Sequence, residues 1–325
     1  MFKSKFLVPA YYKDFKCKGM DCVNTCCRFW NITLTMDDYN HLSNLDVSSD
    51  LREKIDNGVS IFPDATKERY AKIDLSYSGE CKLRLQNGYC GLQCELGEEN
   101  IPAVCRYYPR SPKLHPIPMC SISNSCEWVI EKLINDDSKM TFETLELSFY
   151  FDSEDLLKDY PKDFLKIQQD SFDILSDRSI NMDNRFEKLR EYLGVHILDK
   201  NVIEKVLFQL KKVYSHSFSI RDFLENDFSY NDKLLESACN KYKDFEIQVE
   251  KIMINHMFYM RFPYVNYEFD KSFAYYGAFF VYKFILFILD NNNVLDPISF
   301  ISNFFRVAEH ANMYDIINNN INRLK

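Results

Sequence analysis

The sequence contains few glycines, histidines and tryptophans: 8 Gly, 6 His and 2 Trp among 325 residues. None of the glycines forms GxGxxG or GxxxxGK[ST], which excludes the usual Rossmann dinucleotide site and the P-loop. The paired CxxC of zinc ribbons, the ferredoxin cysteine run and the HExxH of metalloproteases are also missing. The pattern shows no Ser/His/Asp arrangement either, and it therefore gives no support for a hydrolase.

The charge is acidic and unevenly distributed. The chain carries 40 Lys and Arg against 48 Asp and Glu, a net charge of −8, and the whole excess lies in residues 131–325. Nucleic-acid binding needs a basic stripe, so we expect no nucleic-acid partner, and a lysine-bearing partner is more compatible. The first residues have no long apolar run and no small-residue cleavage site, which predicts a cytoplasmic protein without a secretory signal.

Cysteine is the abundant and clustered residue. Ten of the 11 cysteines lie between Cys17 and Cys126, and only Cys239 lies outside. Structural disulfides are rare in a reducing compartment, where a dense cluster more often indicates metal ligation or redox chemistry. The alternative is a set of buried thiols that pack as small hydrophobic side chains. We favour that alternative for Cys239 alone.

The first part of the chain is expected to be loop-rich, since seven of the 10 prolines lie at or before Pro118. Residues 28–35, 69–75 and 81–86 have the pattern of short strands. Thr35 begins the motif T-M-D-D, a weaker form of the capping box that starts a helix. The packed core of this part should be small, and metal ligation would add to its stability.

From about residue 150 the apolar residues recur at intervals of three and four, as at Ile203, Val206, Leu207 and Leu210. This periodicity is typical of amphipathic helices. We therefore predict a mainly α protein, in which a small loop-rich cysteine-cluster domain with a few short strands (1–130) precedes an all-helical domain (131–325).

Residues 272–289 form an 18-residue apolar run in which only Lys283 is charged. That length is near the lower limit for a membrane span. The internal lysine, the three tyrosines and the acidic residues at both ends favour a buried core helix, and we expect no membrane partner.

The cysteine spacing predicts a thiolate site. Cys17, Cys22, Cys26 and Cys27 are close in sequence, and on a helical turn Cys22 and Cys26 would share one face. A second group contains Cys81, Cys90, Cys94, Cys105 and Cys126. Coordination by four cysteines suits either zinc or a [4Fe–4S] cluster, and both stay open at this point.

These segments carry a resemblance to a known family. The sequence resembles the FliB-type flagellin lysine-N-methylases, within the wider CxxxCC zinc/iron-chelating group. The resemblance lies in the segments LVPAYY, FKCKGMDCVNTCC, CKL…GYC, LGEENIPAVCRYYPR and SCEW, and it returns in NHMFYMRFP and NFFRVAEH. It spans nearly the whole chain and is weakest in residues 150–245.

The resemblance implies an enzyme, an S-adenosylmethionine-dependent protein-lysine N-methyltransferase whose protein substrate is flagellin. It also implies a cysteine-ligated iron–sulfur cluster, with zinc as the alternative metal. The cysteines that match the family pattern are Cys17, Cys22, Cys26, Cys27, Cys81, Cys90, Cys105 and Cys126. Cys94 and Cys120 lie outside that pattern.

Few residues are candidates for binding the cofactor, orienting the substrate or accepting a proton. Tyr107 and Arg110 follow Cys105 closely, and Arg110 could neutralise a carboxylate of the cofactor. Arg306 and His310 are spaced i, i+4, and they could orient the substrate or accept a proton. Packing is the preferred interpretation for each of these residues, and also for His256 on its apolar helix face.

Two other functions stay open. One is a cysteine-rich zinc- or iron-binding protein without methyltransferase activity. The other is modification of a different protein or peptide. The methyl transfer itself can be radical or polar, and the sequence does not choose between them.

Overall fold

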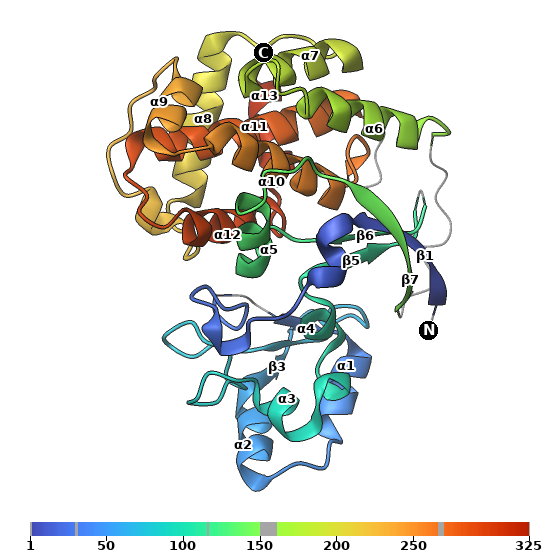
Figure 1. Ribbon diagram of the computed structural model, residues 1–325. Helices are drawn as coiled ribbons and strands as arrows, with labels where there is room; N and C mark the ends of the chain where they lie inside the picture. The colour runs from blue at the N-terminus through green and yellow to red at the C-terminus, as the bar shows by residue number, and fades with distance from the viewer. Residues whose placement is uncertain (1, 30–31, 116, 150–160, 266–269, 325) are drawn as a thin grey trace. The chain divides into compact units, whose positions relative to one another are not determined.

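The computed structural model describes residues 2–29, 32–115, 117–149, 161–265 and 270–324. The chain forms two compact units (Figure 1). We call Lys16–Pro109 the cysteine unit, and Met1–Phe15 with Arg110–Lys325 the helical unit. These bounds do not coincide with the predicted division at residue 130, because the N-terminal strand and the segment after Pro109 join the helical unit through a shared sheet.

The cysteine unit contains a three-stranded antiparallel sheet of order β2-β4-β3 (Ile32–Leu34, Ala71–Ile73 and Val59–Ile61). β2 and β4 lie within the predicted strands 28–35 and 69–75, although residues 30 and 31 fall outside the described part of the chain. The prediction of a strand at 81–86 is wrong. Only isolated bridges, Leu75–Cys81 and Arg84–Cys90, occur there.

Four helices accompany this sheet: α1 (Met36–Ser43), α2 (Ser49–Gly58), α3 (Gly91–Leu96) and α4 (Ala103–Tyr107). α1 begins with the predicted capping box. The Thr35 hydroxyl accepts the Asp38 amide at 3.1 Å, and the Asp38 carboxylate accepts the Thr35 amide at 3.2 Å. Two backbone donors that a helix start leaves unsatisfied are thereby bonded.

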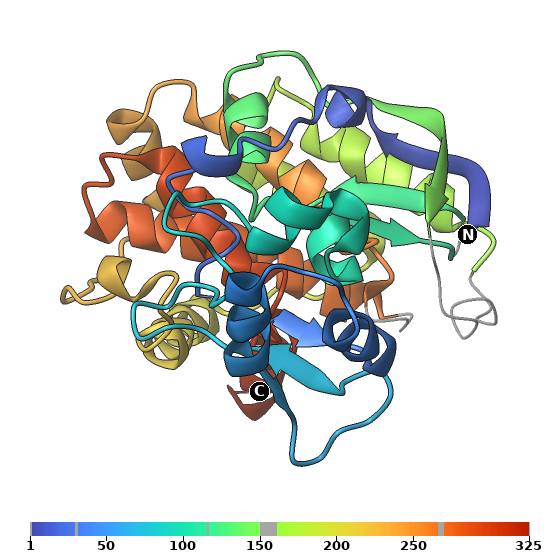
Figure 2. The same ribbon diagram turned by 90° about the horizontal axis from the view of Figure 1, so that it is seen from below.

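A four-stranded sheet of order β5-β6-β1-β7 (Arg110–Lys113, Met119–Ile122, Phe2–Pro9 and Phe142–Phe149) lies in the helical unit. β1 pairs in parallel with β6 and antiparallel with β7, and both views show β1 and β7 side by side (Figures 1 and 2). The prediction of only helices after residue 130 did not anticipate β7. Its signal is the alternation of Leu145, Leu147 and Phe149, which has the period of a strand.

The remaining described elements of this unit are mainly helices, and the mainly α fold class is confirmed. Their bounds are α5 (Glu127–Ile134), α6 (Phe164–Leu175), α7 (Met182–Leu193), α8 (Lys200–Tyr214), α9 (Leu234–Lys241), α10 (Phe245–Tyr259), α11 (Lys271–Asn291), α12 (Pro297–Ala308) and α13 (Met313–Leu324). α11 packs against α7, α8, α9, α10 and α13. By length and composition alone α11 could cross a membrane, but 78% of its apolar stretch is buried in the protein, as expected of a core helix.

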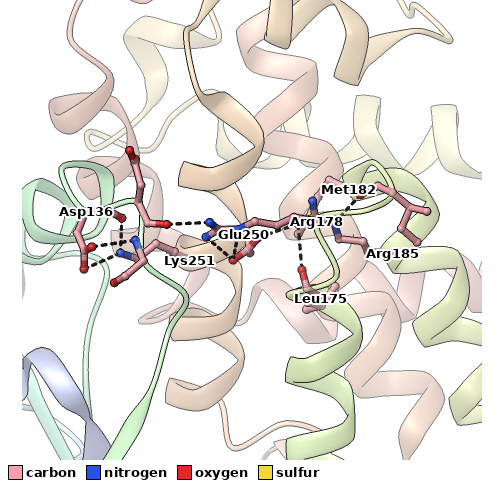
Figure 3. Close-up of polar contacts among 10 residues, drawn as sticks. Asp136, Leu175, Arg178, Met182, Arg185, Glu250 and Lys251 are labelled. Atoms are coloured by element: carbon pink, nitrogen blue, oxygen red, sulfur yellow. Dashed lines mark hydrogen bonds and ion pairs between the residues drawn. The ribbon is translucent and has the colours of Figure 1, made fainter.

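A buried ion network fixes α10 to its neighbours (Figure 3). The fully buried Glu250 carboxylate accepts Nε and Nη2 of Arg178, both at 2.9 Å, and Nη1 of Arg185 at 2.8 Å. The next residue, Lys251, is also buried and lies 3.0 Å from Asp136. Because each buried charge has an opposite partner, the network ties α10 to α7 and to the residues that follow α5 without leaving an isolated charge.

Candidate functional site

In the cysteine unit, the candidate site lies against a small hydrophobic core. Leu34, Leu42, Leu51 and Ile55 are central members of that core. The half-buried Cys81, Cys90 and Cys105 pack against it, although they are far apart in sequence. Folding of this unit therefore brings thiols from three separate segments to one apolar surface.

Local backbone pairing positions these thiols. The amide of Cys81 donates to the carbonyl of Cys27 at 2.9 Å, which joins the first cysteine group to the second. Cys90 occupies the N-cap position of α3, and the amide of Gly91 donates to the Leu83 carbonyl at 2.9 Å. A methyl group on Gly91 would approach that carbonyl oxygen to 3.1 Å, so glycine permits this close passage of the chain beside Cys90.

Cys105 lies on the short helix α4, which α1 holds in place. The Asp38 carboxylate of the capping box also accepts the amide of Ala103 at 3.2 Å. One side chain therefore begins α1 and fixes the first turn of α4. The predicted helix cap and the predicted ligand Cys105 are thus parts of one local structure.

Cys27, Cys81, Cys90 and Cys105 form what we call the thiol quartet. Burial raises the pKa of Cys105, and the neighbouring Cys27, Cys81 and Cys90 thiols raise it further. Burial also raises the pKa of Cys81 to about 12, with contributions from Cys27 and Cys90. Each thiol of this set therefore opposes ionisation of the others, and a cation is what would stabilise them as thiolates.

The other members of the first group lie beside the quartet. A hydrogen bond with Cys27, followed by burial, raises the pKa of Cys26, and the nearby Cys17 and Cys105 thiols add to this shift. Cys17 itself is exposed. The expected helical face shared by Cys22 and Cys26 is wrong, because the 3₁₀ turn Gly19–Asp21 ends before Cys22 and residues 22–27 are not helical.

The quartet fits a thiophilic metal by its donor chemistry, since thiolates select zinc, copper(I) and iron–sulfur clusters. No disulfide is present among the cysteines that the structure describes. Within the same described ranges, no group of three or more His, Cys, Asp or Glu side chains has the spacing of a ready-made metal site. The thiols are neighbours that would have to draw closer together around a metal.

The other predicted residues lie in the helical unit, with one exception. Cys126 is the N-cap residue of α5. The Arg110 guanidinium lies over the Phe15 ring, 4.7 Å from its centroid. Tyr107 belongs to the cysteine unit, where it ends α4 and receives the Arg106 guanidinium 5.2 Å from its ring centroid. The structure thus assigns packing contacts to Arg110 and Tyr107, and their proposed catalytic or cofactor roles stay predictions.

The cysteines outside the family pattern differ in their surroundings. Cys120 is fully buried in β6, and its thiol donates to the Tyr12 hydroxyl at 3.6 Å. Cys94 is exposed on α3. Cys239 is exposed on α9, so the expectation of a buried thiol there is wrong. The contacts of Cys120 are those of a packed core residue.

The second group of predicted residues lies at the end of α12. Arg306 is buried in this helix, which ends at Ala308, so His310 lies just beyond the helix and not on it as expected. Nε2 of His310 contacts the hydroxyls of Ser123 and Ser125 at 3.0 and 2.9 Å, and Glu309 contacts Ser123. The structure therefore assembles serine, histidine and carboxylate side chains that the sequence pattern did not reveal. Because Ser123 and Ser125 are fully buried, the arrangement is not that of an accessible nucleophile.

Comparison with known proteins gives a distant relationship. A 137-residue stretch, 41% of this chain, is 26% identical to the flagellar biosynthetic protein FliU of Salmonella muenchen and covers 78% of that protein. Similarity of the same extent and identity relates the chain to the lysine-N-methylases of Salmonella typhimurium and Salmonella choleraesuis, of which it covers only 33%. No family model matches the chain, and no solved structure does. The chain is thus a distant homologue of FliU and of these lysine-N-methylases.

Proposed function

We propose that this protein is an S-adenosylmethionine-dependent protein-lysine N-methyltransferase that acts on flagellin. The distant similarity to lysine-N-methylases supports the reaction. The observation that carries the metal-binding part of the proposal is the thiol quartet, in which Cys27, Cys81, Cys90 and Cys105 are neighbours within one compact unit. The proposal includes an iron–sulfur cluster of the [4Fe–4S] type, with zinc as the alternative.

The residues of the cysteine unit that would hold the cluster are the quartet, with Cys17, Cys22 and Cys26 beside it as further candidates. Binding would remove protons from thiols that burial and mutual repulsion hold in the neutral form. When bound, a cluster would supply iron coordinated by thiolates, next to the core of the cysteine unit.

Methyl transfer to lysine sets requirements on the rest of the protein. Only the neutral amine attacks, so the substrate ammonium must lose a proton, and the methyl sulfonium must lie in line with the nitrogen. A sulfonium can be held by carboxylates or aromatic faces. The net charge of −8 is compatible with a substrate that presents lysines.

A metal-binding protein without methyl transfer is the second candidate, and the same quartet favours it. Two measurements on anaerobically purified protein separate the two functions. The methyltransferase binds S-adenosylmethionine in calorimetry and transfers methyl from it to flagellin, whereas a metal carrier does neither. Methylation of another protein but not of flagellin would retain the reaction and reject the substrate.

The quartet itself is tested by a matched pair of variants. Cys105→Ser should lose most of the bound metal, because it removes one of the four neighbouring thiols of the quartet. Cys94→Ser, an exposed position outside the family pattern, should retain it. Equal metal content in the two variants would contradict the assignment of Cys105 as a ligand.

A further inference from the structure

The helical unit contains a continuous chain of hydrogen bonds from its interior to an exposed histidine. Glu309 is the central group: its buried carboxylate accepts the Ser123 hydroxyl at 2.5 Å and the Asn124 amide at 3.0 Å. Its other oxygen lies 3.1 Å from Nδ1 of His256, and Nε2 of His256 lies 3.0 Å from the Tyr314 hydroxyl. Every group named here is buried, so this inner part of the hydrogen-bond network is shielded from water.

His310 forms the outer end of this hydrogen-bond network. Nε2 of its ring lies 3.0 Å from the Ser123 hydroxyl, and the residue is exposed at the protein surface. Ser123 therefore stands between an accessible imidazole and a buried carboxylate, in hydrogen-bond contact with both. A serine hydroxyl can accept one proton while it donates its own, which makes it a suitable bridge.

We infer that His310, Ser123 and Glu309 form a proton relay that removes the proton from the substrate lysine. This inference rests on the proposed methyltransferase function. The lysine ammonium gives a proton to the His310 ring, Nε2–H gives its proton to Ser123 Oγ, and Ser123 O–H gives its proton to Glu309 Oε2. The lysine becomes a neutral amine, and the Glu309 carboxylate becomes a carboxylic acid.

The methyl transfer that follows balances in bonds and in charge. The amine lone pair forms the bond to the methyl carbon while the carbon–sulfur bond breaks, and the sulfur of S-adenosylhomocysteine keeps that electron pair. The charge lost by the sulfonium appears on the methylated ammonium. No oxidant or reductant is needed for this polar route.

The surroundings explain why the proton moves inward. The His310 residue is exposed, but Nε2 of its ring faces the buried hydroxyls of Ser123 and Ser125. Burial of the ring on this side, and then the charge of Arg306, lowers the pKa of His310 to about 4, so the imidazole is neutral at pH 7 but holds a proton weakly. Burial raises the pKa of Glu309, which makes this carboxyl a better resting place for the proton. The Tyr259 ring of α10 lies 5.8 Å from the His310 ring, and burial followed by the charge of Glu309 keeps its hydroxyl protonated by raising its pKa.

The test measures the initial rate of methyl transfer to flagellin as a function of pH. His310→Gln should lose about 10²–10⁴-fold in rate near pH 7, the usual contribution of a general base. The rate deficit of His310→Gln should shrink about tenfold for each unit of rising pH, because more of the substrate lysine is then already a neutral amine, up to its pKa of about 10.4. Ser123→Ala should follow the same pattern. His216→Gln, at an exposed histidine outside this network, is the matched control and should behave as the unsubstituted protein.

The outcomes separate two failures. If the unsubstituted protein and His216→Gln methylate flagellin but the deficit of His310→Gln is absent, or is constant with pH, the relay is overturned. If neither of these proteins transfers methyl, the proposed function fails. In either case, NMR titration of the His310 ring tests the link: Glu309→Gln should shift its midpoint to lower pH, and an unchanged midpoint would refute the hydrogen-bonded connection.

Discussion

Gly277 offers a quantitative test of how α11 and α13 pack in the helical unit. A methyl group at this position would overlap the Tyr314 ring, inside van der Waals contact with three ring atoms. In a helix interior, alanine is favoured over glycine by about 1 kcal/mol. Overpacking in a rigid core costs about 1–3 kcal/mol, and an overlap with a buried ring belongs at the upper end of that range. Gly277→Ala should therefore destabilise the protein by about 2 kcal/mol, because the clash exceeds the gain in helix propensity.

The Tyr314→Ala background provides the control, since it removes all three ring atoms that the methyl group would meet. In this background Gly277→Ala should stabilise the protein by about 1 kcal/mol, from helix propensity alone. The two predictions imply a coupling energy of about 3 kcal/mol in a double-mutant cycle. Urea unfolding of the four proteins measures it. Equal effects of Gly277→Ala in both backgrounds would refute the packing between Gly277 and Tyr314.

Three further predictions follow from polar contacts. Glu250→Gln should destabilise the protein by about 3–5 kcal/mol in urea unfolding, because Arg178 and Arg185 lose their buried counter-charge; a loss below about 1 kcal/mol would contradict the network. Thr35→Ala should lower stability by about 1 kcal/mol through loss of the capping box, and Thr35→Ser should restore most of it. Hydrogen bonds, chiefly from Ser138, lower the pKa of Asp136 to about 2, whereas an Asp in the unfolded chain has a pKa of about 3.9. The ionised carboxylate therefore stabilises the folded protein above about pH 3.9, and this contribution is lost as the pH falls toward 2. Asp136→Asn should therefore flatten the acid limb of a stability–pH curve, and an unchanged limb would argue against this contact.

The elements that the sequence predicts well depend on local signals. Thr35 and Asp38 lie three residues apart, and the helix start that they indicate is present with both hydrogen bonds. The apolar spacing at Val206, Leu207 and Leu210 also indicates a helix correctly, and all three residues are buried in α8. In both cases the interacting residues are close in sequence, so a pattern within one or two turns contains the information.

The strands of the helical unit depend on distant partners, and the sequence pattern did not reveal them. β1 pairs with β7, as in the register of Phe6 with Leu145, across most of the first half of the chain. Apolar and polar residues alternate in β7, as in a strand, but the apolar residues that follow in the sequence recur mainly with the period of helices. The predicted boundary at residue 130 differs from the compact units for the same reason, since no local signal shows that β1 leaves the cysteine-rich part.

The candidate site shows the same limit. Clustering along the sequence predicts a thiolate site, which stays a prediction. The set of neighbouring thiols depends on the Cys27–Cys81 backbone pairing and on the Asp38 support of α4, which the sequence does not reveal. The contact between Ser123 and Glu309 joins residues 186 positions apart, and neither residue was predicted. For His310 a structural role was the preferred prediction and proton acceptance the alternative, and its two serine partners emerge only in the folded chain.

Mass spectrometry of flagellin tests the proposed methyl transfer to lysine most directly. The chain is purified anaerobically with its metal content measured, and it is incubated with flagellin and S-adenosylmethionine. We expect lysine-containing peptides to gain the mass of a methyl group, and this gain to require S-adenosylmethionine. Unmodified flagellin after incubation with protein that holds its metal and binds S-adenosylmethionine would contradict the account.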